Sequence, residues 1–396
     1  MSLATPTTDG QHGAVAHSDG GWDDTSRVPV QTRSARFSSV KHDDFPAVTG
    51  QEVDWKLSPV ALLKPLIDDS LDGTPYQLDD QPAQGALVEW VTPDDTRVGS
   101  AGTPEDRASA NAWSSVEKVL AITLSGETRV LFGADRSGFG SAQRAAHTVI
   151  TAKANSSAHV VLRSTGPAQL AENLEIIVED GANLTVVSLQ QWDDDAIHLA
   201  SHFAQVGRDA KLTHIVVSLS GKVVRVNPSV HLSGEGSDAD LFGLYFADAG
   251  QHLEQRVYLH HQAANTKGRV NYKGALQGEG AHTVWVGDVL IGPNASGTDS
   301  YEQNRNLVLT PGTRADSIPN LEIETGDILG AGHASATGRF DDEQLFYLQA
   351  RGISEAEARR LVVVGFLSEI VQKIGDPALE TYLHELIEAE LAGSAA

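Results

Sequence analysis

The feature that most constrains this chain is a short sequence unit that recurs at intervals of 24, 28 and 29 residues. Each copy follows a polar turn and opens a run rich in Val, Ile, Leu and Thr, which is typical of a β-strand. The copies are Ala158-His159-Val160, Ala182-Asn183-Leu184, Ala210-Lys211-Leu212, Ala239-Asp240-Leu241 and Gly268-Arg269-Val270. A period in the twenties is produced by stacked strand units, because each coil buries its inward face only against its neighbours. The spacing therefore favours a solenoid of β coils over residues 116–340, with a β-sandwich of evenly spaced strands as the alternative.

The sequence ahead of the repeat divides into two parts. Residues 1–25 are rich in Ser, Thr, Asp and Gly and have almost no large apolar side chains. Burial could not offset the entropy lost on ordering them, so a disordered tail is expected. Residues 26–115 form an N-terminal region that we expect to be partly helical, with a turn from Thr49 that leads to a buried Trp55. Residues 76–115 lack clean periodicity, and no elements are assigned to them.

The pattern after the repeat is helical and predicts a C-terminal module over residues 341–396. Gly352 stands where a helix-ending glycine is expected. Ser354 and Glu357 have the spacing of a capping box ahead of a second helix. Asp376 then starts a last helix as its N-cap residue. Since solenoids require their open ends to be covered, one role expected of this module is to cap the end of the coil stack.

The composition limits the partners and the location of the protein. The chain has 53 Asp and Glu against 29 Lys and Arg, a formal net charge of -24, which repels phosphate backbones and anionic membrane surfaces. No apolar run approaches the roughly 20 residues that span a bilayer. The first basic residue is Arg27, so no basic signal-peptide segment is present. Neither nucleic acid nor a membrane is an expected partner, and the cytoplasm is the expected location.

Among the 15 histidines, two pairs invite a metal interpretation. His260 and His261 are adjacent, and neighbouring residues on a strand point to opposite faces, which argues against shared ligation. His198 and His202 follow an acidic run in what looks like a connection between strands. Neither pair predicts a metal site.

The sequence contains no complete motif of a known catalytic site. It has no GxxxxGK[ST] phosphate loop, so any use of ATP must come from a partner. It also lacks GxSxG, and the Asp193–Asp195 run is interpreted as a solvated loop. We therefore expect no enzymatic activity. A polysaccharide-acting β-helix enzyme and a structural solenoid that binds proteins without metal remain alternatives, because fold alone does not decide function.

Three runs near the end of the repeat resemble a known family. They are ADSIPNLEI at residues 315–323, the turn from His333 to Gly338, and DDEQLFYLQARGI at residues 341–353. These runs are similar to the core domain of the SufB/SufD family of iron–sulfur cluster assembly scaffold proteins. The family usually has Cys-Ser-His-Gly-Ala-Thr at the turn, whereas this chain has Ala331 and Gly332 before the histidine. The resemblance implies a mainly β fold, with a right-handed parallel β-helix core, a helical N-terminal region and a helical C-terminal module.

The absence of cysteine shapes what the resemblance implies for a metal site. Cysteine thiolate is the usual ligand of iron–sulfur clusters, so the chain alone is expected to bind no stable cluster. The resemblance implies His333 as a metal ligand at a transient cluster or iron site shared with a cysteine-bearing SufB partner, since histidine can replace cysteine at one iron. Within the family, the missing cysteine favours the SufD branch over the longer SufB branch.

The resemblance also implies partners. It makes the chain a non-catalytic subunit of a SufB–SufC–SufD complex, which pairs with SufB through its β-helix and docks the SufC ABC-type ATPase through its helical module. ATP would then be supplied through SufC. The expected docking residues are Leu361, Val364 and Leu367, which follow a helical stripe. A homodimer is a further option for the isolated chain.

Overall fold

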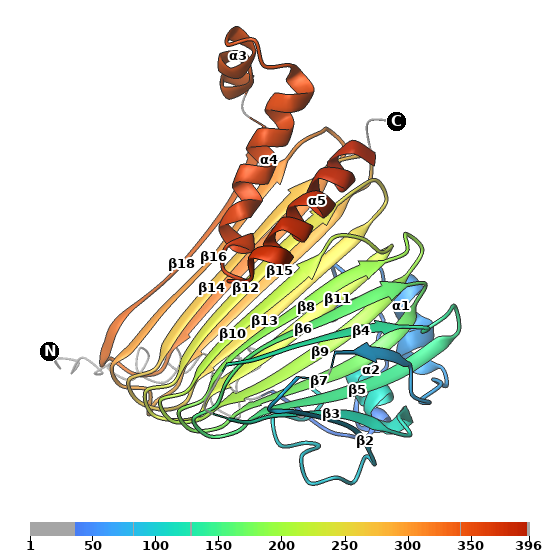
Figure 1. Ribbon diagram of the computed structural model, residues 1–396, viewed down its shortest axis with the longest axis vertical. Helices are drawn as coiled ribbons and strands as arrows, with labels where there is room; N and C mark the ends of the chain where they lie inside the picture. The colour runs from blue at the N-terminus through green and yellow to red at the C-terminus, as the bar shows by residue number, and fades with distance from the viewer. Residues whose placement is uncertain (1–35, 82, 127–128, 341, 394–396) are drawn as a thin grey trace, which may run out of the picture.

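The computed structural model describes residues 36–81, 83–126, 129–340 and 342–393. The expected disordered tail lies outside these ranges, as do the first ten residues of the N-terminal region. The described chain forms a long stack of coils built from two nine-stranded sheets, with helices at both ends of the sequence (Figure 1).

One sheet contains β1 and every even-numbered strand except β2. The other contains β2 and every odd-numbered strand except β1. The first sheet contains, in spatial order, β1 (Gln77–Asp80), β4 (Val130–Ser137), β6 (Ser157–Gly166), β8 (Asn183–Trp192), β10 (Lys211–Ser218), β12 (Asp238–Ala247), β14 (Lys267–Leu276), β16 (Thr298–Val308) and β18 (Ile328–Arg339). The second contains, from its other end, β2 (Ala86–Val91), β3 (Val119–Leu124), β5 (Gln143–Ala152), β7 (Gln169–Val178), β9 (Ile197–Val206), β11 (Val223–Leu232), β13 (His252–His261), β15 (His282–Ile291) and β17 (Arg314–Ile323).

The chain alternates between the two sheets, and each strand pairs in parallel with the strand one coil earlier. The only antiparallel pairs among these strands are β1 with β4 and β2 with β3, at the N-terminal end of the stack. A parallel β-solenoid is thereby confirmed, and the sandwich alternative is wrong because a sandwich is built from antiparallel sheets.

The repeat located the coils but not their register. Leu184 pairs with Leu212 in the next coil, whereas it pairs with Ala158 and not with Val160 in the previous one. Between some coils, the alignment given by the recurring unit therefore differs from the true strand register by two residues. Side-chain direction alternates along a strand with period two, so a slip of two leaves the same set of side chains facing inward.

Alternate residues of each strand fill the interior between the sheets. Large aliphatic side chains such as Leu184, Val216 and Leu241 are fully buried there and form one continuous core along the stack. Burial of each such side chain contributes about 1.5–3 kcal/mol. Each coil depends on its neighbours for this burial, which explains why the fold needs the whole repeat.

The N-terminal region covers the outer face of the second sheet. It contains η1 (His42–Asp44), α1 (Val60–Asp68) and α2 (Arg107–Ser115). The apolar faces of α1 and α2 pack on β5, β7 and β9. Trp55 is buried in this layer, and the Glu52 carboxylate accepts hydrogen bonds from the backbone N–H groups of Thr49 and Gly50. The predicted turn and buried tryptophan are confirmed. Residues 76–115, which the sequence did not resolve, supply β1, β2 and α2.

Three helices make up the C-terminal module: α3 (Asp342–Ala350), α4 (Glu355–Val371) and α5 (Pro377–Gly393). Gly352 takes a positive φ of 86° after α3, and the Ser354 hydroxyl accepts from the Glu357 N–H at the start of α4. The Asp376 carboxylate accepts from the first N–H groups of α5. All three predicted helix boundaries are therefore confirmed. No helix in the described ranges is long and apolar enough to cross a membrane.

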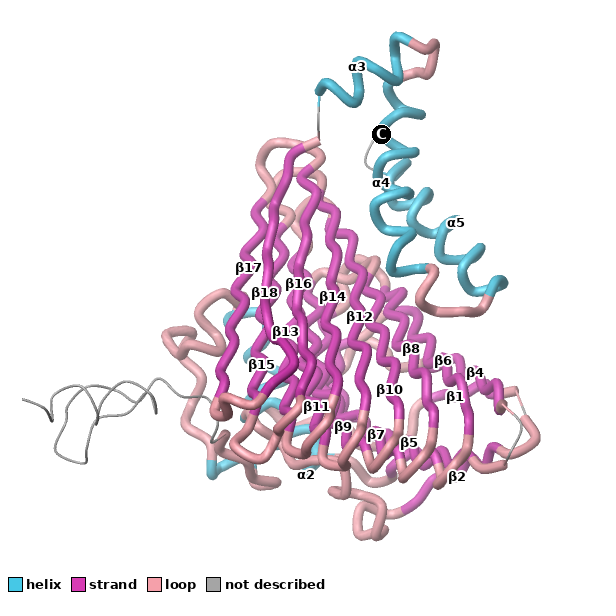
Figure 2. Tube along the Cα trace, turned by 90° about the vertical axis from the view of Figure 1, so that its left-hand side faces the viewer, coloured by secondary structure: helices cyan, strands magenta, loops and turns pink. Residues whose placement is uncertain are grey.

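The expected capping role of this module is wrong. Buried residues of α4 and α5 pack against the outward-facing side chains of β8, β10, β12 and β14, including Leu189, Ile215, Phe242 and Leu244. Lys273 on β14 donates to the Phe366 carbonyl and pairs with Glu369 on α4 at 2.6 Å. The module thus lies along the flank of the first sheet, because that sheet face is apolar. It leaves β17 and β18 uncovered at the end of the stack (Figure 2).

Candidate functional site

The last coil of the solenoid ends in two edge strands. β18 is the outermost strand of the first sheet and β17 the outermost strand of the second, so each has a strand neighbour on one side only. At the opposite end of the stack, β1 and β2 add antiparallel strands to the sheets. The C-terminal end is therefore the less protected one.

His333 lies within β18 and not in a turn, which corrects the sequence interpretation. The small residues around it suggested a turn, but they pair one by one with β16 and keep the backbone extended, with a register shift only at the start of β18. His333 stands opposite Glu302 in this ladder. Its side chain is 46% exposed, so the imidazole is open to solvent and is not a buried structural histidine.

A row of side chains on β18 faces the interior of the last coil. Paired residues of neighbouring strands point to the same face of a sheet. The residues opposite this row on β16 are all buried: Ser300, Glu302, Asn304 and Asn306. The row itself contains Ala331, His333, Ser335 and Thr337. Ala331, at the position where the family usually has cysteine, therefore shares a face with the histidine.

Glu302 is the unexpected member of this site. Its side chain is 1% exposed, and its Oε1 lies 3.7 Å from the His333 Nδ1. Burial, followed by the charge of Asp288, raises the pKa of Glu302 to about 8, although the backbone N–H of Asn320 acts in the opposite direction. Neither carboxyl oxygen makes a hydrogen bond of good geometry within the described residues.

Sequence reasoning missed Glu302 because nothing in its local sequence separates it from an exposed glutamate. β16 alternates polar and charged residues on both faces, so its inward face cannot be recognised by hydrophobicity. The only available signal was its place in the repeat, one coil before His333.

Three of the four histidines considered earlier lie in the interior of the solenoid. His198 and His202 lie in β9 and not in a connection, because the acidic run ahead of them forms the turn. The His198 Nε2 is 2.8 Å from Glu172, whose carboxylate also pairs with Arg136 at 2.7 Å. His202 faces His214 at 3.1 Å, and burial holds the pKa of His202 well below its ordinary value.

His260 and His261 point to opposite faces, as expected. His261 is fully buried, with its two ring nitrogens within 3.0 Å of Thr266 and Ser300. His260 lies on the other face beside Gln262. No group of three or more His, Asp or Glu side chains in the described part of the chain is arranged to hold a metal ion.

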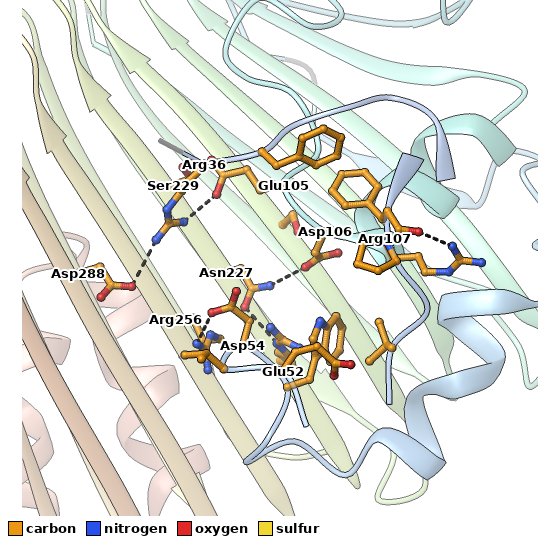
Figure 3. Close-up of a pocket in the computed structure, with 18 of the residues that line it drawn as sticks. Arg36, Glu52, Asp54, Glu105, Asp106, Arg107, Asn227, Ser229, Arg256 and Asp288 are labelled. Carbon is orange, nitrogen blue, oxygen red and sulfur yellow. Dashed lines mark hydrogen bonds and ion pairs between the residues drawn. The ribbon is translucent and has the colours of Figure 1, made fainter. Parts of the chain in front are cut away.

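A groove of ≈ 920 Å³ lies between the N-terminal segment and the second sheet (Figure 3). Its arginines are paired within the chain: Arg36 contacts Glu105 at 2.7 Å and Asp288 at 3.3 Å, and Arg256 contacts Asp54 at 2.8 Å. The six carboxylates of the lining outnumber its four arginines, so the groove has no excess positive charge to attract an anion. These pairs tie the N-terminal segment to the sheet.

The three predicted docking residues do not share one surface. Leu367 is fully buried against the sheet, Val364 is partly buried, and Leu361 is 43% exposed. The predicted stripe meets the buried face of α4 at Leu367, whereas Val363 and not Leu361 or Val364 is the buried residue one turn earlier. Larger exposed apolar side chains lie on α3, where Phe346 is 73% and Tyr347 56% exposed, and α3 projects away from the solenoid (Figure 1).

Comparison with known proteins identifies the family to which the chain belongs. Residues 135–366 match the family model described as "SUF system FeS cluster assembly, SufBD core domain". An "iron-sulfur cluster assembly SufBD family protein" of Mycobacterium bovis is 47% identical over 367 residues, covering 90% of this chain and 92% of the relative. A relative with the same description from Mycobacterium leprae is 47% identical over 376 residues, covering 92% and 96% of the two chains.

A second Mycobacterium leprae relative of this description is 30% identical over 253 residues, which is 62% of this chain but only 29% of that protein. The matched core contains the coils from β4 onward, both edge strands and most of α4. The chain therefore belongs to the SufB/SufD family of iron–sulfur cluster assembly proteins.

Proposed function

We propose that this chain is a non-catalytic scaffold subunit of the SufD type, which pairs through its open solenoid end with a cysteine-bearing SufB-type paralogue. The observation that carries the proposal is the uncovered pair of edge strands, β17 and β18, with the solvent-open His333 on one of them. Family membership supports a role in iron–sulfur cluster assembly. The choice of the SufD branch is supported by the absence of cysteine.

The edge at β18 has the properties of a pairing surface. Natural edge strands are usually short or are protected by Lys, Pro or a covering segment. β18 has 12 residues, contains neither Lys nor Pro, and is covered by no described helix. Apolar side chains are exposed around it, with Leu329 at 79%, Tyr301 at 42% and Ile323 at 42%. A second β-helix could add its own edge strands here and bury these side chains.

In this complex His333 would contribute a nitrogen ligand to the cargo, a transient iron or iron–sulfur cluster, while thiolates would come from the paralogue. Histidine takes such a place at one iron of Rieske centres. The isolated chain would then bind no stable cluster, and it could instead pair with a second copy of itself through the same edges.

The helical module would dock an ABC-type ATPase of the SufC kind, which would supply ATP hydrolysis. The exposed surface of Phe346, Tyr347 and Leu361 replaces the predicted surface that included Leu367, because Leu367 is occupied in holding the module to the sheet. Large, rigid apolar side chains are suited to anchoring a partner. The proposal places all three proteins in the cytoplasm.

Copurification tests this proposal. Tagged chain, isolated from cells under mild conditions, should bring down an ABC-type ATPase and a cysteine-bearing paralogue. Tyr347→Glu should remove the ATPase and leave the paralogue bound, because α3 projects beyond the end of β18 and does not lie along its edge (Figure 2). Recovery of the chain alone, or only with polysaccharide, would contradict the proposal and favour a structural solenoid or an enzyme.

A further inference from the structure

We propose that Glu302 is a second metal ligand beside His333, so that this chain offers a nitrogen–oxygen pair to a divalent first-row metal such as Fe(II). This inference rests on the proposed role of His333 as a cargo ligand and extends it. It makes a mononuclear ion, and not a preformed cluster, the cargo that this chain can hold first.

The spacing of the two groups suits a shared ion. The His333 Nδ1 and the Glu302 Oε1 are 3.7 Å apart, which is longer than a hydrogen bond between nitrogen and oxygen. Two ligand atoms each about 2.1 Å from a tetrahedral metal lie about 3.4 Å apart. A small rotation of the exposed imidazole would close the difference, since no hydrogen bond within the described residues fixes that ring in place.

Glu302 is buried without the partners that buried carboxyl groups normally have. Its side chain is 1% exposed, and neither oxygen has a hydrogen-bond partner of good geometry in the described residues. The other deeply buried carboxylates of the solenoid are paired: Glu172 with Arg136 and His198, and Glu254 with His252. An orphaned buried acid costs stability and calls for an explanation. A metal ion would satisfy it.

The opposite sheet leaves space for this carboxyl group at β15. A Cβ atom on Gly287 would lie 2.2 Å from the Glu302 Oε2 and 2.4 Å from the Trp285 ring. The glycine in β15 therefore makes room for both the Glu302 carboxyl group and the Trp285 ring. Since Gly287 is extended backbone with no positive φ, turn geometry does not account for the glycine.

The chemistry of the pair indicates the class of metal. Imidazole and carboxylate suit Fe(II) and related ions, whereas clusters prefer thiolate. The pair reaches solvent only through the half-exposed His333, at the end proposed to meet the paralogue. Two protein ligands leave positions for water or for the thiolates of that partner.

Co(II), a spectroscopic substitute for Fe(II), provides the test. The full-length chain without a tag would be titrated with Co(II) under anaerobic conditions, followed by visible absorption. The variants are Glu302→Gln, which keeps the shape of the side chain, and His333→Ala. Glu324→Gln is the matched control, since Glu324 is exposed just after β17. Circular dichroism would verify that each variant is folded.

The wild-type chain and Glu324→Gln should each bind Co(II) at one saturable site with the same affinity. Glu302→Gln and His333→Ala should each weaken that affinity by at least about tenfold, which is the lower bound seen when even an outer-shell partner is lost. If only His333→Ala weakens binding, Glu302 is no ligand and this inference fails while the role of His333 stands. If neither variant changes binding, or the wild-type chain shows no saturable site, the pair is not a metal site. The copurification result would still decide the scaffold role separately.

Discussion

Substitution of Leu367 by alanine should detach the C-terminal module from the solenoid without unfolding the coils. Leu367 is fully buried between α4 and the outward face of the first sheet. Removal of its three outer carbons loses roughly 0.8 kcal/mol for each, and the cavity left behind brings the expected cost to about 2–5 kcal/mol. That cost falls on the helices, because the core between the sheets lies on the other side of the sheet and is separate from this contact.

Hydrogen exchange followed by mass spectrometry measures this local opening. A loss of 2 kcal/mol corresponds to roughly 30-fold faster exchange in α4 and α5, with exchange in β10 and β12 unchanged. Leu361→Ala is the matched control, since Leu361 lies on the same helix and is 43% exposed. The assignment of Leu367 to this contact would be refuted if both substitutions changed hydrogen exchange in α4 equally. It would also be refuted if the Leu367→Ala variant exchanged in α4 at the wild-type rate.

Three further predictions concern the interior of the solenoid. Glu172→Gln should cost about 3–5 kcal/mol in denaturant unfolding, because it leaves the buried Arg136 without its carboxylate. Burial lowers the pKa of His214 to about 4, so the unfolded chain takes up a proton at higher pH than the folded chain. Its stabilising contribution is complete above about pH 6.5 and falls by about 3 kcal/mol as the pH drops to 4, measured as a falling urea midpoint. Gly243→Ala should lower the melting temperature, because the new Cβ would lie 2.0 Å from a tyrosine ring. Gly133→Ala should leave the melting temperature unchanged, because no atom lies within 4 Å of the new Cβ.

Much of the fold could be predicted from the repeat and the helix signals. Stacked coils follow from the period itself, and the boundaries at Gly352, Ser354 and Asp376 follow from local capping chemistry. The placement of the helical module could not be predicted, since capping and flanking both bury an apolar helix face. The outward apolar residues of β8 to β14 decide between them, and they can be recognised only once the register is known.

The site was predictable only in part. His333 was found through the family pattern, yet its position in a strand was hidden because glycine and alanine are poor indicators of β structure. Its partner Glu302 is 31 residues away in sequence and adjacent in space only through the ladder between β16 and β18. Long-range pairing of this kind depends on register, which a period with two-residue slips does not specify.

The most direct test of the pairing surface uses the absence of cysteine in this chain. A single Leu329→Cys variant would carry one thiol on the exposed edge of β18, where the native side chain is 79% exposed. Its labelling rate with a maleimide would be measured for the free chain and after assembly with the cysteine-bearing paralogue, by mass spectrometry of this chain. Leu87→Cys, at the opposite end of the stack and 56% exposed, is the control. Assembly should slow labelling at residue 329 by at least about tenfold, as expected for a thiol enclosed in a packed interface, and leave residue 87 unchanged. Equal labelling at residue 329 before and after assembly would show that the partner does not bind at the open end of the solenoid.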